Sequence, residues 1–306
     1  MVHLGLECIQ ATLHLVEQAV EAAPDLKIVL GQEILRIALS EKQVEQLRDT
    51  ACRLPQYCEW MEPAALPSSV VQTPSSILGG LRIARGGSLV LHAPSYLKGL
   101  YKACANLARQ KNIRIEWKTS SQNLVDTVEW GDYDTVVLAA GAGVLQNLWP
   151  ACDLPIQLVR GQSVELTATT TSPLPLALLC GKYVSPLPGD RILVGATHEF
   201  QAEPWSADEV KTALLEKTCP FYTWKPTSVE SVTEGFRVQS QRGPRGRRPI
   251  LGKCDWPYHN KTFVFTGLSS RGILYHAYYG QALVDEILTG KPSSLLTLDD
   301  VNWWRS

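Results

Sequence analysis

Two short apolar runs that each end in a glycine turn constrain the fold of this 306-residue chain more than any other feature. The first, Thr135 to Ala140, is continuously apolar and is followed by Gly141-Ala-Gly143. The second, Thr262 to Thr266, leads through a glycine-rich turn into a helical pattern that runs from about Ile273 to a stop at Gly290. Continuous apolar strands are typical of parallel sheets that are buried on both faces. The sequence therefore predicts an α/β layer with glycines at the carboxyl ends of its strands.

Helices and strands alternate through the first 117 residues. Ile9, Leu13, Val16 and Val20 recur at steps of four and three, which places one apolar stripe on a helix. The predicted elements are that helix, ending near Pro24, strands over 27–30 and 33–39, a helix over 44–54, an extended pair turning at Gly86-Gly87, a helix over 95–110 and a strand over 113–117. In the helix over 95–110, the side chains expected to face inward are Leu97, Leu100, Tyr101, Cys104 and Leu107.

The middle of the chain has a different pattern. From Pro155 to Gly235, several predicted strands, such as 162–167 and 191–195, are separated by proline-rich turns. One helix interrupts them, and it begins with Ser206 and Glu209 at the spacing of a capping box. This pattern predicts a separate, mostly antiparallel domain.

Composition and charge exclude several classes of protein. A formal net charge of −1 provides no overall basic field for nucleic acid. No apolar run reaches the roughly 18 to 20 residues that span a membrane. The N-terminus lacks the pattern of a secretory signal, so the cytoplasm is the expected location. The 8 cysteines form no CxxC pair and no histidine sits at metal-ligand spacing, so we expect reduced thiols and no metal site.

Five motifs follow one another between residues 133 and 272. They are Tyr133-Asp-Thr-Val-Val-Leu-Ala-Ala-Gly-Ala-Gly143, Val159-Arg-Gly-Gln162, Leu193-Val-Gly-Ala-Thr197 with Glu199, Gly235-Phe-Arg237 running on to Arg248-Pro-Ile-Leu-Gly252, and Phe265-Thr-Gly-Leu-Ser-Ser-Arg-Gly272. Each motif alone is weak. Together and in this order they resemble the D-amino acid oxidase family of FAD-dependent oxidoreductases, in particular its glycine oxidase and sarcosine oxidase branch.

The resemblance implies a FAD site at the two glycine turns. Its cofactor-binding residues would be Ala140, Gly141, Gly267, Ser269, Ser270, Arg271 and Gly272. Glycines at the carboxyl end of a strand let backbone amides approach a flat, anionic cofactor closely. The amino end of the long helix would stabilise negative charge on the reduced ring. The alternative is that both segments are ordinary turns and that Arg271 is solvated.

The resemblance assigns the substrate carboxylate to Arg237, the one residue expected to act in catalysis by orienting the substrate. The guanidinium fork suits bidentate capture of a carboxylate. Arg160, in the Arg-Gly-Gln turn, would support the site indirectly. The alternative for Arg237 is a salt bridge at the protein surface.

One part of the family pattern is not in this sequence. The family opens with a strand, a Gly-x-Gly-x-x-Gly turn and a helix that holds the pyrophosphate. The nearest match, Gly141-x-Gly143, has Gln146 in place of the last glycine. We therefore expect an incomplete FAD-binding Rossmann-like domain over 1–26, 79–152 and 249–306, a substrate domain over 27–78 and 153–248, and weak binding of FAD by the 306-residue chain.

The reaction that the resemblance implies is oxidation of the carbon–nitrogen bond of an amino acid or a secondary amine. A hydride leaves the α-carbon for the flavin, and water hydrolyses the resulting imine; this requires positioning more than a protein acid or base. A second possibility is the oxidoreductase part of a tRNA wobble-uridine modification enzyme, with RNA contacted by the loop over 242–248, whose arginines are Arg242, Arg245, Arg247 and Arg248. A third is a non-catalytic remnant that binds a ligand or a partner.

Overall fold

The computed structural model describes residues 2–67, 77–84, 86–119, 128–143, 154–169, 176–189, 191–201, 203–218, 225–243, 246–296 and 303–304. The chain divides into two compact units. Unit 1 comprises residues 1–15, 108–159 and 236–306, and unit 2 comprises residues 16–107 and 160–235. The divisions fall inside four elements, which are α1 (Val2–Ala22), α3 (Ala93–Gln110), β7 (Ile156–Thr169) and β11 (Lys225–Ser240).

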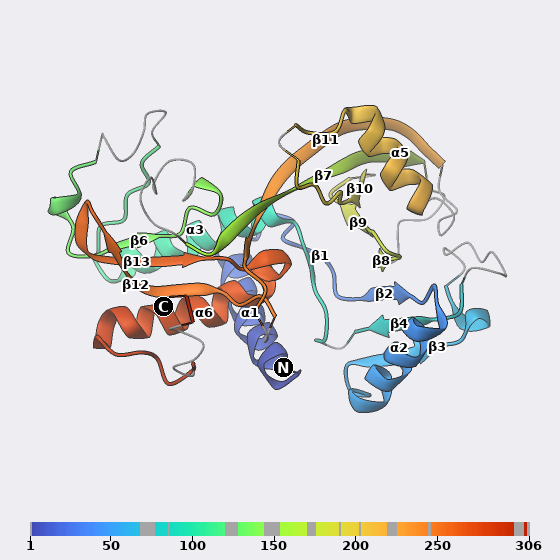
Figure 1. Ribbon diagram of the computed structural model, residues 1–306, viewed down its shortest axis with the longest axis horizontal. Helices are drawn as coiled ribbons and strands as arrows, with labels where there is room; N and C mark the ends of the chain where they lie inside the picture. Colours follow the sequence, from blue (N-terminus) through green and yellow to red (C-terminus); the bar gives the residue numbers. More distant parts are fainter. Residues whose placement is uncertain are drawn as a thin grey trace. The chain divides into compact units, whose positions relative to one another are not determined.

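Unit 1 is built on a three-stranded sheet in the order β12-β13-β6. Strands β12 (Ile250–Trp256) and β13 (His259–Thr266) are antiparallel, and β6 (Val136–Leu138) pairs in parallel with β13. The parallel pairing predicted for the run over 135–140 is confirmed, although the strand is shorter than the run. The predicted burial of the strand is wrong on one face, because Val137 is 44% exposed. Helix α6 (Gly272–Thr289) runs along this sheet in Figure 1. Short 3-10 helices precede β6 and α6, namely η2 (Trp130–Asp132) and η5 (Ser269–Arg271).

The two faces of the unit 1 sheet bury different side chains. On one face, Leu251 and Phe263 pack with Cys8 and with Tyr278 and Tyr279 of α6. On the other face, a second cluster is rich in tryptophan. Its buried members are Val136, Leu138, Ile250, Cys254, Trp256 and Val264, and Trp130, Trp303 and Trp304 pack against them. Because neighbouring residues of β13 belong to different clusters, the central strand is buried on both sides, as a continuous apolar run predicts.

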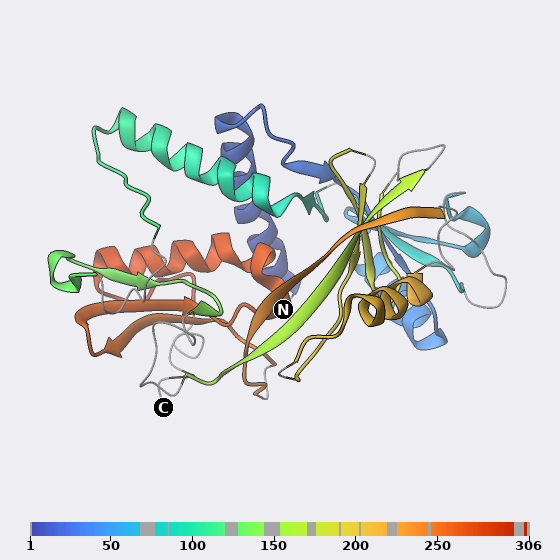
Figure 2. The ribbon, with the colours of Figure 1, turned by 90° about the horizontal axis from the view of Figure 1, so that it is seen from above.

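The largest sheet has eight strands in the order β11-β7-β10-β9-β8-β2-β4-β3. The strands not yet located are β2 (Ile34–Ile37), β3 (Cys58–Met61), β4 (Gly80–Ile83), β8 (Ala177–Leu179), β9 (Tyr183–Leu187) and β10 (Arg191–Gly195). Of the pairings described between them and with β7, only that of β2 with β8 is parallel. In Figure 2 the green β7 and the orange β11 are long neighbouring ribbons. The mostly antiparallel middle region predicted from the sequence is confirmed.

Two capped helices cover parts of this sheet. Helix α2 (Glu41–Arg53) begins after Ser40, whose Oγ accepts from the backbone N–H of Gln43 at 3.4 Å. Helix α5 (Ala207–Thr218) begins with the predicted capping box, because Ser206 Oγ accepts from Glu209 N at 3.3 Å and Glu209 Oε2 accepts from Ser206 N at 2.7 Å. The remaining short elements of unit 2 are η1 (Pro63–Ala65) and the paired strands β1 (Val29–Gly31) and β5 (Val90–Leu91).

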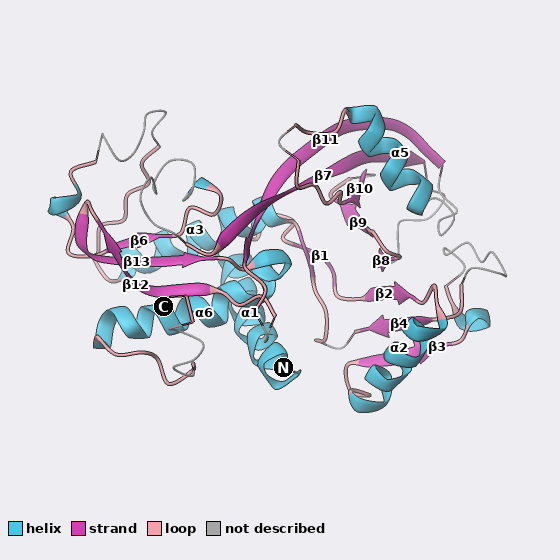
Figure 3. Cartoon of the chain, in the orientation of Figure 1, coloured by secondary structure: helices cyan, strands magenta, loops and turns pink. Residues whose placement is uncertain are grey.

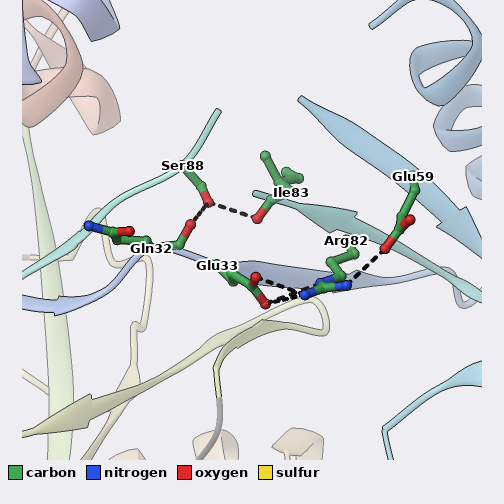
Figure 4. Close-up of polar contacts among 6 residues, drawn as sticks. All are labelled: Gln32, Glu33, Glu59, Arg82, Ile83 and Ser88. Carbon is green, nitrogen blue, oxygen red and sulfur yellow. Dashed lines mark hydrogen bonds and ion pairs between the residues drawn. The ribbon is translucent and has the colours of Figure 1, made fainter. Parts of the chain in front are cut away.

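An arginine ties three segments of unit 2 together (Figure 4). Arg82 on β4 donates to both carboxylate oxygens of Glu33 at 2.7–3.1 Å and to Glu59 Oε1 on β3 at 3.0 Å. The hydrogen bonds that Arg82 donates to these carboxylates, first of all to Glu33, raise the pKa of Arg82. All three residues line a small pocket of about 110 Å³. Since the charges there pair with one another, the pocket is part of the scaffold.

The predicted strand over 113–117 is wrong. Figure 3 draws this segment as a loop, and Ile113, Ile115 and Trp117 are 64%, 42% and 72% exposed. A strand forms only where its backbone groups meet a neighbouring strand, and within the described ranges no strand pairs with this segment. Alternating apolar residues cannot provide that partner.

Two further expectations about unit 2 are wrong. Of the five residues of α3 expected to face inward, four are exposed, namely Leu97, Tyr101, Cys104 and Leu107. The face that packs is centred on Gly99, where an added Cβ would lie 2.8 Å from the Ala19 carbonyl oxygen, so backbones in close approach decide which face is buried. The two extended segments beside Gly86-Gly87 do not pair with each other, because β4 pairs with β2 and β3 whereas β5 pairs with β1.

No helix within the described residues has the length and apolar character to cross a bilayer.

Candidate functional site

The two glycine turns lie at one edge of the unit 1 sheet. Because β6 and β13 are adjacent parallel strands, their carboxyl ends meet at the same edge, and Gly141 and Gly267 follow those ends. Gly141 has φ +55° and Gly267 has φ +73°, a left-handed conformation that favours glycine. Ala140 and Gly141 are exposed, and a Cβ added to Gly141 would meet no atom within 4 Å. The backbone at Gly141 is therefore open to a close-fitting ligand, whereas Gly267 is buried.

The second turn leads directly into α6. Ser269 also has positive φ, at +57°, and its hydroxyl donates to the Gly267 carbonyl at 3.4 Å. No side-chain hydrogen bond caps α6 at its N-cap, Arg271, and an added Cβ on Gly272 would meet nothing within 4 Å. The amino end of an 18-residue helix presents free amide N–H groups and a partial positive charge. An electron-rich group is therefore favoured at this position.

Arg271 and Ser270 lie at the exposed side of the same turn. One guanidinium nitrogen of Arg271 donates to the Tyr275 hydroxyl at 2.6 Å, and the guanidinium carbon lies 5.6 Å from the centroid of the tyrosine ring. Arg271 is thus held against its own helix, and its positive charge adds to that of the helix end.

Two buried hydroxyl groups lie beside Gly267, and sequence analysis did not single them out. Ser240, the last residue of β11, is 0% exposed, and Thr266, the last residue of β13, is 3% exposed. Within the described part of the chain, neither Ser240 Oγ nor Thr266 Oγ1 has a hydrogen-bond partner. The Cβ of Ser240 lies 3.6 Å from the position that a Cβ on Gly267 would take. Thr266 belongs to the fifth sequence motif, but no sequence signal places Ser240 beside it, because the adjacency of β11 and the turn is a tertiary contact.

Arg237 lies on β11 within unit 1 and is half-buried. Gln239, two residues later, forms a backbone bridge with Leu268 of the second turn. Two residues of a strand span about 7 Å, and their side chains leave the same face of the strand. Arg237 therefore lies on the strand that meets the turn at Leu268. The roughly 7 Å between Arg237 and Gln239 along the strand is within the reach of a long arginine side chain.

Arg160 belongs to unit 2 and supports a different cluster. Its Nε lies 3.4 Å from Glu234 Oε2, and its backbone exchanges two hydrogen bonds of 3.0 Å with Glu199. The buried Glu199 carboxylate accepts from the Thr197 hydroxyl and, at 3.3 Å, from the backbone N–H of Trp205. Two of the motifs quoted from the sequence are thus joined by this network.

The basic loop that suggested RNA binding is partly committed to contacts within unit 1. Arg247 donates to the carbonyl oxygen of Ser240, and the Arg248 guanidinium lies 5.0 Å from the centroid of the Trp303 ring. Arg242 is exposed, and Arg245 lies outside the described residues. Two of the four arginines are therefore used to hold the chain to itself.

The described residues contain no group of three or more histidine, cysteine or acidic side chains placed to hold a metal ion. His276 Nδ1 lies 2.8 Å from the Ile273 carbonyl, and burial lowers the pKa of this histidine. His259 Nε2 lies 2.7 Å from the Tyr133 carbonyl. These histidines have individual backbone contacts.

The residues at the sheet edge fit a flavin. At Gly141 and Gly272, where an added Cβ would meet no atom within 4 Å, there is room for a flat ring against the backbone. The helix end and Arg271 supply positive charge, and the hydroxyls of Ser240 and Thr266 supply buried hydrogen-bonding groups. A flavin combines a flat ring with carbonyl and N–H groups, so it matches both the shape and the polarity.

Among curated proteins, this chain resembles the tRNA 5-methylaminomethyl-2-thiouridine biosynthesis bifunctional protein MnmC of Pseudomonas savastanoi pv. phaseolicola. The two are 25% identical over 178 residues, which is 55% of this chain and 26% of that protein. A similar protein of the same name from Pseudomonas putida is 36% identical over 69 residues, which is 22% of this chain and 11% of that protein. The chain thus matches about a quarter of the first relative's length.

Solved structures share the fold over nearly the whole chain. Glycine oxidase from Bacillus cereus aligns with a TM-score of 0.72 and 19% identity, covering 97% of this chain and 83% of that one. Iminodiacetate oxidase from Chelativorans sp. aligns with a TM-score of 0.69 and 17% identity, covering 96% and 82%. L-alpha-glycerophosphate oxidase from Mycoplasma pneumoniae, solved with FAD bound, aligns with a TM-score of 0.65 and 19% identity, covering 95% and 84%.

The fold class predicted from the sequence is confirmed by these alignments, and so is the resemblance to the D-amino acid oxidase family. The model of that family matches residues 3–286. This chain belongs to the D-amino acid oxidase family of FAD-dependent oxidoreductases.

Proposed function

We propose that this chain catalyses FAD-dependent oxidation of the carbon–nitrogen bond of an amino acid or a secondary amine. The observation that carries the proposal is the meeting of three segments in unit 1. Gly141 and Gly267 follow adjacent parallel strands, and β11, which carries Arg237, bridges the second turn at Leu268. In this proposal, the two turns would form a flat cofactor site and Arg237 would supply a cation for a carboxylate beside it.

Each residue has a distinct role in this proposal. Bound FAD would supply the acceptor for a hydride from the substrate's α-carbon. Ala140, Gly141 and the turn over 267–272, with Ser269, Ser270, Arg271 and Gly272, would hold the flavin. Arg237 would bind the substrate carboxylate through two of its guanidinium nitrogens, and this would hold the α-carbon against the ring. Unit 1 would then be the cofactor-binding part.

The choice of a substrate with a carboxylate rests on Arg237 more than on the fold. The fold neighbours include enzymes named for glycine and iminodiacetate, which carry an amine and a carboxylate, but also one named for glycerophosphate. A planar guanidinium at the substrate position favours a carboxylate held in two contacts. Phosphate binding would also use arginine, so a direct comparison of substrates is needed.

The test is anaerobic mixing of the FAD-loaded protein with glycine, sarcosine, iminodiacetate or glycerol 3-phosphate. We expect the amines to bleach the oxidised-flavin absorbance and glycerol 3-phosphate to leave it unchanged. Bleaching by glycerol 3-phosphate alone would contradict the proposed substrate class.

A second candidate is the oxidation of a carboxymethyl-amino group on tRNA. The similarity to the MnmC proteins favours it. The contacts of Arg247 and Arg248 with Ser240 and Trp303 weigh against a basic track in the loop over 242–248. We therefore place a small amine first and a tRNA-borne amine second.

A further inference from the structure

The hydroxyl groups of Ser240 and Thr266 are buried polar groups of unit 1 that have no hydrogen-bond partner among the described residues. Both side chains are more than nine-tenths buried, and neither hydroxyl has a partner within the described residues. A buried hydroxyl without a hydrogen bond costs roughly 1 to 3 kcal/mol. Folded proteins therefore provide such groups with a partner, which is a protein atom, a water or a ligand.

Both hydroxyls are carried by backbone that is held firmly. The carbonyl of Ser240 accepts from Arg247, and the neighbouring residues Gln239 and Gln241 bond to Leu268 and to the Pro155 carbonyl. Thr266 is paired with Ile250 in the β12–β13 ladder. Groups fixed in this way are suited to positioning a ligand, because little freedom is lost on binding.

The two side chains border the same turn. Ser240 Cβ lies 3.6 Å from the position of an added Cβ on Gly267, and Thr266 immediately precedes that glycine. Since side chains alternate along a strand, Ser240 leaves β11 on the opposite face from Arg237. One carboxylate therefore cannot contact both Arg237 and Ser240, and the hydroxyls are separate from the proposed carboxylate site.

We infer that Ser240 Oγ and Thr266 Oγ1 bind the polar edge of the flavin ring at the Gly267 turn. This rests on the proposed cofactor site and assigns it two residues that were not among its predicted cofactor-binding residues. A hydroxyl both donates and accepts, and the polar edge of the ring offers carbonyl oxygens and an N–H group. The hydroxyls and the ring then satisfy one another's hydrogen-bonding groups.

The variants are Thr266→Val and Ser240→Ala, and each has a matched control. Thr262 lies on the same strand and is 0% exposed, but its hydroxyl donates to the His259 carbonyl at 2.9 Å, so Thr262→Val is the control for Thr266→Val. Ser88 is buried and its hydroxyl donates to two carbonyls, those of Gln32 and Ile83, so Ser88→Ala is the control for Ser240→Ala. Thr266→Ser keeps the hydroxyl and serves as the rescue.

Three quantities are measured for every protein, namely the urea midpoint without flavin, the dissociation constant of FAD, and the dissociation constant of riboflavin, which lacks the phosphates and the adenine. For Thr266→Val and Ser240→Ala we expect an unchanged or higher midpoint and roughly 3- to 10-fold weaker binding of both flavins, the scale of one lost hydrogen bond. The two controls should lower the midpoint and leave both dissociation constants unchanged. Thr266→Ser should restore them.

The opposite pattern overturns the inference. If both variants lower the midpoint and bind flavin like the parent, the hydroxyls serve the fold, for example through a buried water. If only FAD binding weakens and riboflavin binding does not, the hydroxyls meet another part of the cofactor. Failure of the parent to bind either flavin would refute the proposed function itself, and this is a different result from normal binding in the variants.

Discussion

The chemistry of the Arg237 side chain limits the substrates that the proposed site can bind. Its residue type allows a bidentate contact with a carboxylate, but the same type is common in surface salt bridges. The structure adds that the residue is half-buried and two positions before Gln239, which bridges the glycine turn at Leu268. These observations favour a site residue, although the sequence alone left both interpretations open.

Replacing Arg237 tests this at the residue scale. Arg237→Ala should lower kcat/KM for a carboxylate substrate by about 2 to 4 kcal/mol, or roughly 30- to 700-fold, because a charge-assisted pair is left unmade. Arg237→Lys keeps the charge and loses the fork, so it should recover only part of the loss. Flavin content, measured by absorbance, should match the parent in both variants. Equal turnover by all three proteins would place Arg237 outside the site.

At the scale of elements, the turn between β13 and α6 combines several local features. Gly267 and Ser269 both have positive φ, η5 follows, and α6 ends at Gly290, which is also left-handed. The sequence predicted the strand, the turn and the helix end, because each depends on neighbouring residues. A positive φ is less common at a serine such as Ser269 than at a glycine, since a residue with a side chain loses free energy in that conformation.

The turn and the helix interior should respond to alanine with opposite signs. Gly267→Ala places a side chain at φ +73°, next to Ile250 and Ser240, and should lower the free energy of unfolding by about 1 to 2 kcal/mol. Gly280 lies within α6, and an added Cβ there would meet no atom within 4 Å. Gly280→Ala should therefore raise the free energy of unfolding by about 0.5 to 1 kcal/mol.

Urea unfolding of both variants, followed by circular dichroism, checks this pair. A stabilising Gly267→Ala would mean that the turn does not hold its left-handed conformation in solution.

At the scale of the whole molecule, charge distinguishes the two candidate substrates. The chain has a formal net charge of −1, and two arginines of the basic loop contact Ser240 and Trp303. Nucleic-acid binding depends on clustered free cations that release counterions from phosphates. A small amine makes no such demand, so the overall charge agrees better with the first candidate.

Titration of labelled tRNA at several salt concentrations tests the second candidate. We expect weak binding at physiological salt, in the range of non-specific association, about 10⁻⁴ to 10⁻⁶ M. Changing Arg242 and Arg245 to glutamine should leave the salt dependence unaltered. The matched control is the same change at Arg48 and Arg53, two exposed arginines of unit 2. Tight binding that falls with the first pair and survives the second would make tRNA the leading substrate.

The sequence by itself determined the features that depend on neighbouring residues. The capping box at Ser206, the stop of α2 before Pro55, the glycine turns and the apolar run over 135–140 were all predicted, and the structure contains each of them. The order of these segments also indicated the family, because motif order survives where overall identity is low.

Only the tertiary structure decided which segments meet. It paired β6 with β13, placed the hydroxyl of Ser240 beside Gly267, and left the alternating segment over 113–117 without a strand partner among the described residues. It also buried the Gly99 side of α3, where backbones approach closely, and exposed Leu97. The physical reason is that the period of the apolar residues indicates whether a segment is a helix or a strand, whereas contacts between residues far apart in the chain determine which segments pack together.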